Sequence, residues 1–115
     1  MKDNVIVDKS KAFALRTIKL YKYLCDEKRE YVLSKQLLRS GTSIGANVRE
    51  AKRAQSKADF YAKMNIALKE ADESAYWLEL LFESDYIEES AYKSIFADCN
   101  EIIKILASIV KSKTS

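Results

Sequence analysis

The chain has 115 residues, of which 48% are apolar and 32% are charged, a length and balance typical of one globular domain spanning residues 1–115. It has no proline, no histidine and only two glycines, which favours long helices and excludes Ser-His and Cys-His catalytic pairs and the Glu-x-x-His motif of ferritin-like iron sites. The net charge of +3 is uneven, because residues 1–57 carry 14 Lys or Arg against 6 Asp or Glu, whereas residues 58–115 carry 6 against 11.

The first predicted helix covers residues 8–28. Phe13, Thr17, Tyr21 and Leu24 recur at three- and four-residue steps and form one mainly apolar stripe. The charged stretch DEKRE at residues 26–30 is the expected turn. Both cysteines, Cys25 and Cys99, fall in apolar stripes, so we expect buried free thiols, with a disulfide or a reactive thiol as the alternative.

The second predicted helix covers residues 31–54 and includes the unusual stretch RSGTSIGANVREA, which holds both glycines. An apolar stripe steps through this stretch by three or four residues without losing phase, so we expect helix and not a loop. No Gly-Lys-Ser/Thr follows the glycines, which argues against a phosphate-binding loop. Gly41 and Gly45 cost about 1 kcal/mol each relative to alanine. They form a smooth strip that lets another helix backbone approach closely.

Two further helices complete the pattern. The third begins after the AQSK stretch, with Ser56 as its N-cap, and runs to about residue 83. The fourth covers about residues 88–111, with Ile95, Cys99, Ile102, Leu106 and Ile109 as its apolar seam. Because the connections are short, neighbouring helices must be antiparallel. The predicted fold is an all-α, up-down-up-down four-helix bundle.

The second helix also carries a basic stripe opposite its apolar face. Its cations have the spacing to follow a phosphate backbone, and the predicted nucleic-acid-binding residues are Lys35, Arg39, Arg49, Lys52, Arg53 and Lys57. Tyr61 and Tyr76 are possible stacking partners for bases. The alternative interpretation is an ordinary solvated helix face.

The run LLRSGTSIGANVREA, followed by SKADFYAKMNIALKEADESAYWLELL, resembles the bacterial four-helix-bundle proteins encoded by intervening sequences in 23S ribosomal RNA genes. The resemblance covers nearly the whole chain. Its most specific residues are Ser43-Ile44, Asn47-Val48 and Glu50, then the Ile66-Ala67 and Glu73 region. Gly45 stands where many members carry proline, and Ala51 where many carry glycine, which should straighten the helix here.

The resemblance implies a four-helix fold, a homopentamer around a central axis and an RNA association. Accessory proteins of diversity-generating retroelements, which join a reverse transcriptase and nucleic acid through basic surfaces, are similar in fold. The motif residues Gly41, Ser43, Gly45, Asn47 and Glu50 are interpreted as structural. Asn47 and Glu50 are helix neighbours, and we expect them to make buried or interfacial hydrogen bonds that fix register.

The residues and the resemblance together predict a cytoplasmic, non-enzymatic RNA-associated homo-oligomer, for which the resemblance favours a pentamer. No cofactor, no metal and no membrane contact are expected, because no catalytic or metal-ligating constellation and no apolar run of ~20 residues is present. The alternative is a scaffolding oligomer that recruits a protein partner and binds little or no nucleic acid. The basic half of the chain favours the first hypothesis and the acidic half favours the second.

Overall fold

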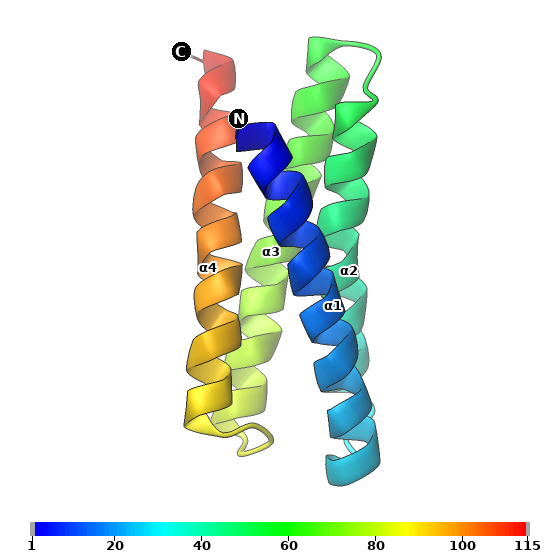
Figure 1. Cartoon of the computed structure of the whole chain (residues 1–115), viewed down its shortest axis with the longest axis vertical. Helices are drawn as coiled ribbons and strands as arrows, with labels where there is room; N and C mark the ends of the chain where they lie inside the picture. Colours follow the sequence, from blue (N-terminus) through cyan, green and yellow to red (C-terminus); the bar gives the residue numbers. More distant parts are fainter. Residues whose placement is uncertain (1, 115) are drawn as a thin grey trace.

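The protein is an all-α bundle of long helices. The computed structural model describes the backbone of residues 2–114 and the side chains of residues 4–114. α1 spans Lys2–Lys28, α2 Leu33–Lys52, α3 Lys57–Glu83 and α4 Glu89–Lys111, followed by a 3₁₀ turn, η1, at Ser112–Thr114. Figure 1 shows α1 and α3 running down the long axis while α2 and α4 run up it. The predicted all-α four-helix fold is confirmed.

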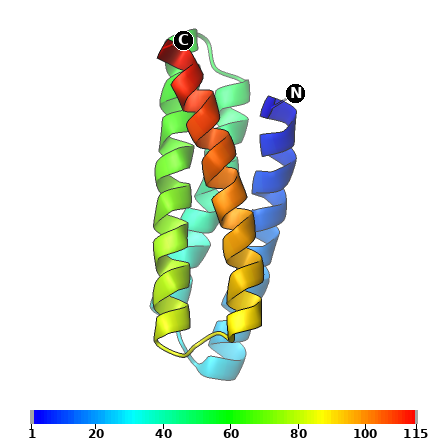
Figure 2. The same ribbon diagram turned by 90° about the vertical axis from the view of Figure 1, so that its left-hand side faces the viewer.

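One hydrophobic core runs along the bundle, which measures 44 × 20 × 19 Å. α2 packs on α1 and α3, and α4 packs on α3 and α1. Seen from the side in Figure 2, the helices lie roughly parallel to the long axis, so each can turn one stripe inward along its length. All four helices contribute fully buried side chains, for example Phe13, Ile44, Met64 and Leu106.

The first helix begins about two turns earlier than the sequence predicts, at Lys2 and not at residue 8. Ile6 explains the difference, because its side chain is fully buried and extends the apolar stripe of α1 towards the N-terminus. At the other end, α1 stops at Lys28 as expected, and Arg29 takes a left-handed backbone conformation with φ 52° that ends the helix.

Glu30 explains why α2 begins at Leu33 and not at residue 31. Its carboxylate accepts hydrogen bonds from the backbone N–H groups of Val32, Leu33 and Ser34 at 2.7–3.0 Å. In return, the Ser34 hydroxyl donates to the Glu30 carbonyl at 2.8 Å. These bonds satisfy amides that a helix start leaves without partners. The predicted turn at residues 26–30 therefore contains the cap of the following helix.

The glycine-containing stretch is helical, as predicted, and lies within α2. Its strip faces α1: a Cβ atom added to Gly41 would lie 2.6 Å from the Thr17 Cγ2, and one added to Gly45 would lie 3.6 Å from the backbone of Ser10. The other side of α2 meets α3 through a buried 2.8 Å hydrogen bond between the hydroxyls of Ser40 and Ser74. The small residues thus let α2 pack tightly on both neighbours.

The third helix begins as predicted, because the Ser56 hydroxyl accepts a 3.0 Å hydrogen bond from the Asp59 backbone N–H. Both cysteines are free thiols, which confirms that part of the prediction. Cys99 is fully buried, whereas Cys25 is only half-buried. Burial raises the pKa of the Cys99 thiol to about 12, and the nearby Asp72 and Asp98 carboxylates act in the same direction.

Candidate nucleic-acid interface

The predicted basic stripe lies on the outward side of α2, but its members do not act alike. Lys35, Arg49, Arg53 and Lys57 are exposed. Lys52 is exposed as well, and its Nζ donates a 3.4 Å hydrogen bond to Asn4 Oδ1. Four of these cations gather where α2 passes into α3: Arg49, Lys52, Arg53 and Lys57. Lys35 stands about 21 Å from the level of Arg49, because fourteen residues separate them at ~1.5 Å per residue.

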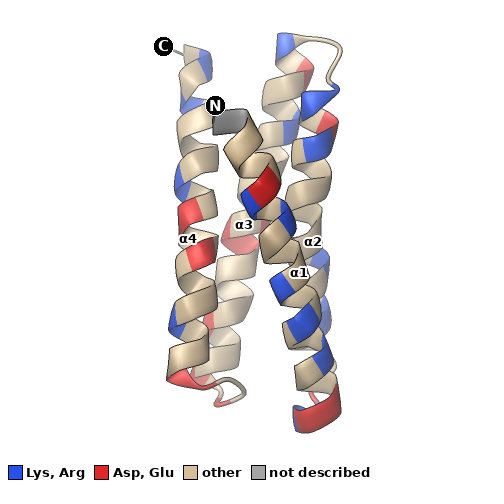
Figure 3. Ribbon diagram, in the orientation of Figure 1, with Lys and Arg blue, Asp and Glu red and all other residues tan. Residues whose placement is uncertain are grey.

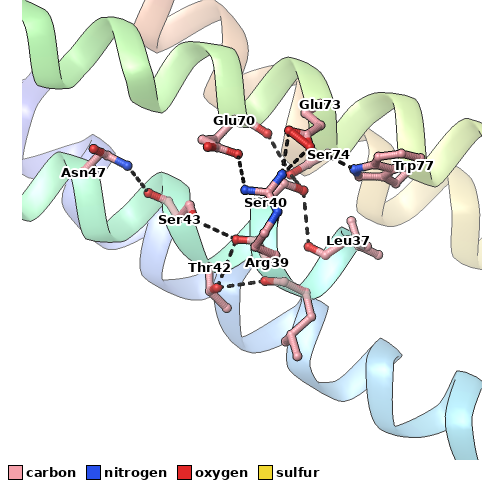
Figure 4. A network of polar contacts seen from close by, with 11 residues as sticks. Leu37, Arg39, Ser40, Thr42, Ser43, Asn47, Glu70, Glu73, Ser74 and Trp77 are labelled. Carbon is pink, nitrogen blue, oxygen red and sulfur yellow. Dashed lines mark hydrogen bonds and ion pairs between the residues drawn. The ribbon is translucent and has the colours of Figure 1, made fainter. Parts of the chain in front are cut away.

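Arg39 is directed away from the stripe, towards α3. Figure 4 shows its guanidinium group between Glu70 and Glu73. Its Nη1 lies 3.4 Å from Glu70 Oε1, and its Nη2 donates to Glu73 Oε1 at 2.7 Å and also to Glu73 Oε2. The hydrogen bond with Glu73 is the main reason that the pKa of Arg39 is raised. The carboxylates of Glu70 and Glu73 therefore offset the positive charge of Arg39, which the sequence predicts to contact a nucleic-acid phosphate.

Trp77 extends this network along α3, since its indole N–H donates to Glu73 Oε2 at 3.3 Å (Figure 4). The small polar residues of α2 bond to their own helix. Ser43 donates to the Arg39 carbonyl at 2.7 Å, and the Asn47 amide donates to the Ser43 carbonyl at 2.9 Å. These contacts satisfy the polar groups locally, and Arg39 with Glu70 and Glu73 ties α2 to α3.

The expected burial of Asn47 and Glu50 is corrected within the single chain. Asn47 is half-buried and bonds only to its own helix in the contacts that the structure describes. Glu50 is exposed and forms a 3.1 Å ion pair with Lys63 of α3. Helix period explains both positions, because these residues lie on the flank of α2 beside α3 and not on the stripe that faces the core. A contact of either residue with another subunit stays a prediction.

The structure adds cations that the sequence did not link to the stripe. The Tyr61 hydroxyl lies 3.1 Å from the Ser112 hydroxyl, so the C-terminal end of α4 lies beside the start of α3, and Lys111 and Lys113 are exposed there. Lys11 and Lys22 are exposed on α1. Figure 3 shows basic segments along α1 and α2 and at the upper end, and acidic ones on the middle of α4 and at the lower end. The sequence places Lys11 and Lys22 outside the apolar stripe of α1. Only the fold shows that they lie beside α2.

An open groove lies between α1 and α4 on another side of the bundle. It has a volume of about 580 Å³ and an apolar lining that includes Leu20, Tyr23, Ile87 and Ile95. Above it, the two helices are joined by a 2.6 Å ion pair of Arg16 with Asp98 and a 3.1 Å ion pair of Lys9 with Glu101. Figure 1 shows α1 and α4 diverging below these contacts.

The described part of the chain forms neither a metal-binding cluster nor a membrane-spanning helix. Among the described residues, no group of three or more His, Cys, Asp or Glu side chains is placed to hold a metal ion. No helix formed by residues 2–114 combines the length and the apolar character needed to cross a membrane. The features that remain are charged and apolar surfaces: the basic side of α1 and α2, and the groove between α1 and α4.

The fold and these surfaces define a small helical-bundle protein with separate basic and acidic regions. The chain belongs to the 23S rRNA-intervening sequence protein family, whose model matches residues 2–108. It is also similar to the crystal structure of a protein of unknown function from the S23 ribosomal protein family of Bacteroides thetaiotaomicron, with 61% sequence identity and a TM-score of 0.95 over 96% of this chain and 99% of that one. No protein with a curated description matches the chain.

Proposed function

We propose that this protein is a non-enzymatic, RNA-associated helical-bundle protein that acts in the cytoplasm as a homo-oligomer. The observation that carries the proposal is the group of exposed cations where α2 passes into α3: Arg49, Lys52, Arg53 and Lys57. Exposed Lys and Arg side chains that contact phosphates release bound counterions, which is the main source of affinity in sequence-independent binding to nucleic acids. The family is named after an intervening sequence of 23S ribosomal RNA, which agrees with a role related to ribosomal RNA.

Local charge balance supports the same group of residues. Glu50 is the acidic residue nearest to the group along α2, and Lys63 offsets its charge. Lys111 of α4 and Lys113 of η1 add positive charge at the same end of the bundle, where Ser112 lies beside Tyr61 of α3. Few phosphate contacts per subunit give weak binding, with Kd values of about 10⁻⁴ to 10⁻⁶ M. Repetition of the group in an oligomer raises the avidity if one RNA reaches several subunits.

Salt-dependent binding to a structured RNA tests the proposal. Fluorescence anisotropy of a labelled RNA hairpin should show an affinity that falls steeply with salt, and Arg49→Glu/Arg53→Glu should flatten the slope of log affinity against log salt by about two. The matched control is Lys93→Glu/Lys104→Glu, which makes the same charge change at exposed sites of α4. The absence of salt-sensitive binding by the parent protein would refute the proposal.

Assembly is a separate part of the proposal, and the outer surface of α3 supports it. Ile66 and Tyr76 are 40% and 54% exposed there, beside the half-buried Trp77. Exposed apolar side chains on the outer side of a helix provide apolar area that another subunit can cover. Light scattering should give a mass several times that of one chain, with five times as the preferred value. Ile66→Glu/Tyr76→Glu should reduce the mass, and a monomer mass for the parent would contradict the assembly.

A scaffolding function is the second candidate, and the groove between α1 and α4 favours it. Its apolar floor at Leu20, Ile87 and Ile95 is a surface that a protein segment can cover. RNA binding separates the two candidates. If RNA binding is absent while Tyr23→Glu, a substitution at the edge of the groove, abolishes binding of a protein encoded beside the gene, scaffolding replaces the RNA-associated function.

A further inference from the structure

The glycine strip places α1 and α2 so close together that their outer sides form one surface. Ser10 contacts Gly45, Thr17 contacts Gly41, and Asn4 bonds to Lys52, which together set the antiparallel register of the two helices. In this register Lys22 of α1 stands about level with Lys35 of α2. Lys11 stands about level with Gly45, one turn below Arg49.

The cations nearest to the α1–α2 seam form two groups separated by a mainly uncharged region. The lower group is Lys22 and Lys35, and the upper group is Lys11, Arg49 and Arg53, all exposed, with the exposed Asp8 one turn from Lys11. Lys19, which is also exposed between the two levels, lines the α1–α4 groove on the other side of α1. The upper group begins about 15 Å and ends about 27 Å above the level of Lys35, at ~1.5 Å per helical residue. The region between them contains Leu15, which is 59% exposed, with Ile18 and Thr42. We call this region the waist.

Arg39 would have interrupted the waist, but its charge is directed elsewhere. It is the basic residue of α2 between Lys35 and Arg49, and its guanidinium group is held by Glu70 and Glu73 on α3 (Figure 4). The Thr42 hydroxyl donates to the Leu38 carbonyl, with 2.8 Å between the two oxygens. The lone pairs of the hydroxyl oxygen are therefore available to accept a hydrogen bond from a ligand. Along the α1–α2 seam the surface therefore alternates between positive, mainly uncharged and positive zones.

We infer that this α1–α2 surface binds double-stranded RNA, with the two cation groups on the phosphates of opposite strands and the waist over the minor groove between them. The inference rests on the proposed RNA association and names its ligand. The minor groove of A-form RNA is wide and shallow, displays 2′-hydroxyl groups and is recognised by shape. A rigid surface two helices wide fits it. The same surface is too broad for the grooves of B-form DNA, since the major groove of about 12 Å admits one helix.

Single-stranded RNA fits the surface less well. Proteins that bind single strands combine a continuous basic track with aromatic side chains on which the bases stack. The exposed aromatic side chains of the described residues do not lie between the two cation groups: Tyr23 is in the α1–α4 groove, Tyr76 is on α3, and Tyr31 is in the α1–α2 loop, beyond the lower group. The waist also breaks the basic track. Both features favour two separate strands over one continuous strand.

Anisotropy titrations at fixed salt test the inference with three probes of one sequence: an RNA duplex, one of its strands alone, and the corresponding DNA duplex. The RNA duplex should bind most tightly. Lys22→Glu/Lys35→Glu and Arg49→Glu/Arg53→Glu should each weaken its binding on the order of tenfold or more and reduce the salt slope by about two. Lys93→Glu/Lys104→Glu is the matched control and should change little. Circular dichroism checks that each variant keeps its helicity.

The outcomes separate this inference from the broader function. If the single strand or the DNA duplex binds as tightly as the RNA duplex, the fit to the A-form minor groove is wrong. If Lys22→Glu/Lys35→Glu binds like the control while Arg49→Glu/Arg53→Glu is weakened, the two-strand arrangement is wrong and RNA association stands. If none of the probes shows salt-sensitive binding to the parent protein, both the inference and the proposed function are wrong.

Discussion

The contact of Gly41 with Thr17 leaves no room for a side chain on α2. A Cβ atom at position 41 would lie 2.6 Å from the Thr17 Cγ2 and 2.9 Å from its Oγ1. Gly45 differs, because a Cβ atom there would lie 3.4 Å from the Ser10 Oγ and 3.6 Å from its backbone, within ordinary contact distance. Space therefore requires glycine at position 41 but not at position 45.

Gly41→Ala should lower the free energy of unfolding by about 1–3 kcal/mol, the usual cost of forcing extra atoms into a packed contact. This loss should exceed the gain in helix propensity of about 1 kcal/mol that alanine brings. Gly45→Ala is the matched substitution and should be neutral or stabilising, because it brings the same propensity gain without the close contact. Urea unfolding followed by circular dichroism measures both changes.

Adding Thr17→Ala to Gly41→Ala should recover part of the lost stability, since it removes both the Cγ2 and the Oγ1 atoms that meet the new methyl group. The double variant also supplies the control for a general effect of alanine in α2. Equal stability of the Gly41→Ala and Gly45→Ala proteins would show that the Thr17 contact does not limit position 41.

The helical period of the apolar residues predicts where the helices lie in the chain. It does not predict which side chains of different helices contact one another. The apolar steps through Ile44 and Val48 correctly gave a helix across both glycines, because burial on one face offsets their low propensity. The same reasoning placed Arg39 on a solvated basic stripe. Glu70 and Glu73 are more than thirty residues away in the chain, and no local pattern on α2 indicates their approach.

The cap at Glu30 shows a different limit. The capping pattern at Ser56 was recognised because a hydroxyl residue directly precedes the helix that it caps. Glu30 lies three residues before Leu33 inside a run of charged residues, which resembles a solvated turn. It is 8% exposed in the structure and accepts bonds from three consecutive backbone amides, next to Arg29 in its left-handed conformation.

Glu30→Gln should make the stability of the protein less dependent on acid pH. Burial alone would raise the pKa of the Glu30 carboxyl, but the hydrogen bonds from Leu33, Ser34 and Val32 together outweigh it and lower the pKa. A group with a lowered folded pKa stabilises the fold above its unfolded pKa of about 4.3, and this contribution is lost as the pH falls through the folded value.

At neutral pH the parent should therefore be more stable than Glu30→Gln by about 0.5–2 kcal/mol, the usual value of a helix cap. The difference should shrink as the pH falls below about 4.3. Urea unfolding of both proteins across this range measures it. A difference that stays constant down to the lowest pH would show that the charge of Glu30 does not stabilise α2.

The two thiols should react at very different rates. Cys99 is fully buried, donates to the Ala71 carbonyl at 3.3 Å and has a pKa raised to about 12, so almost none of its thiolate forms at mildly alkaline pH. Cys25 is half-buried and should react first. A thiol-specific chromogenic reagent should modify one cysteine of the folded protein quickly and the second only after denaturant is added. Cys25→Ser should remove the fast phase, and its persistence would place the reactive thiol at Cys99.

Arg39→Ala should affect RNA binding much less than Arg49→Ala. The Arg39 guanidinium group is already paired with Glu70 and Glu73, whereas Arg49 is exposed on the outer side of α2. The ion pairs of Arg39 are partly exposed, so their loss in Arg39→Ala should cost only about 0.2–1 kcal/mol of stability. Trp77, the single tryptophan of the chain, should report the change through its emission, because Glu73 accepts its indole N–H.

Glu73→Gln supplies the control, since it removes one charge that offsets Arg39 and keeps the shape of the side chain. This variant should bind RNA at least as tightly as the parent, and it should change the emission of Trp77. A double-mutant cycle of Arg39→Ala and Glu73→Gln, with affinity and unfolding measured in parallel, separates the two roles of Arg39. If Arg39→Ala and Arg49→Ala weaken binding equally, Arg39 leaves its glutamates for a phosphate, and the uncharged waist between the cation groups does not exist in the complex.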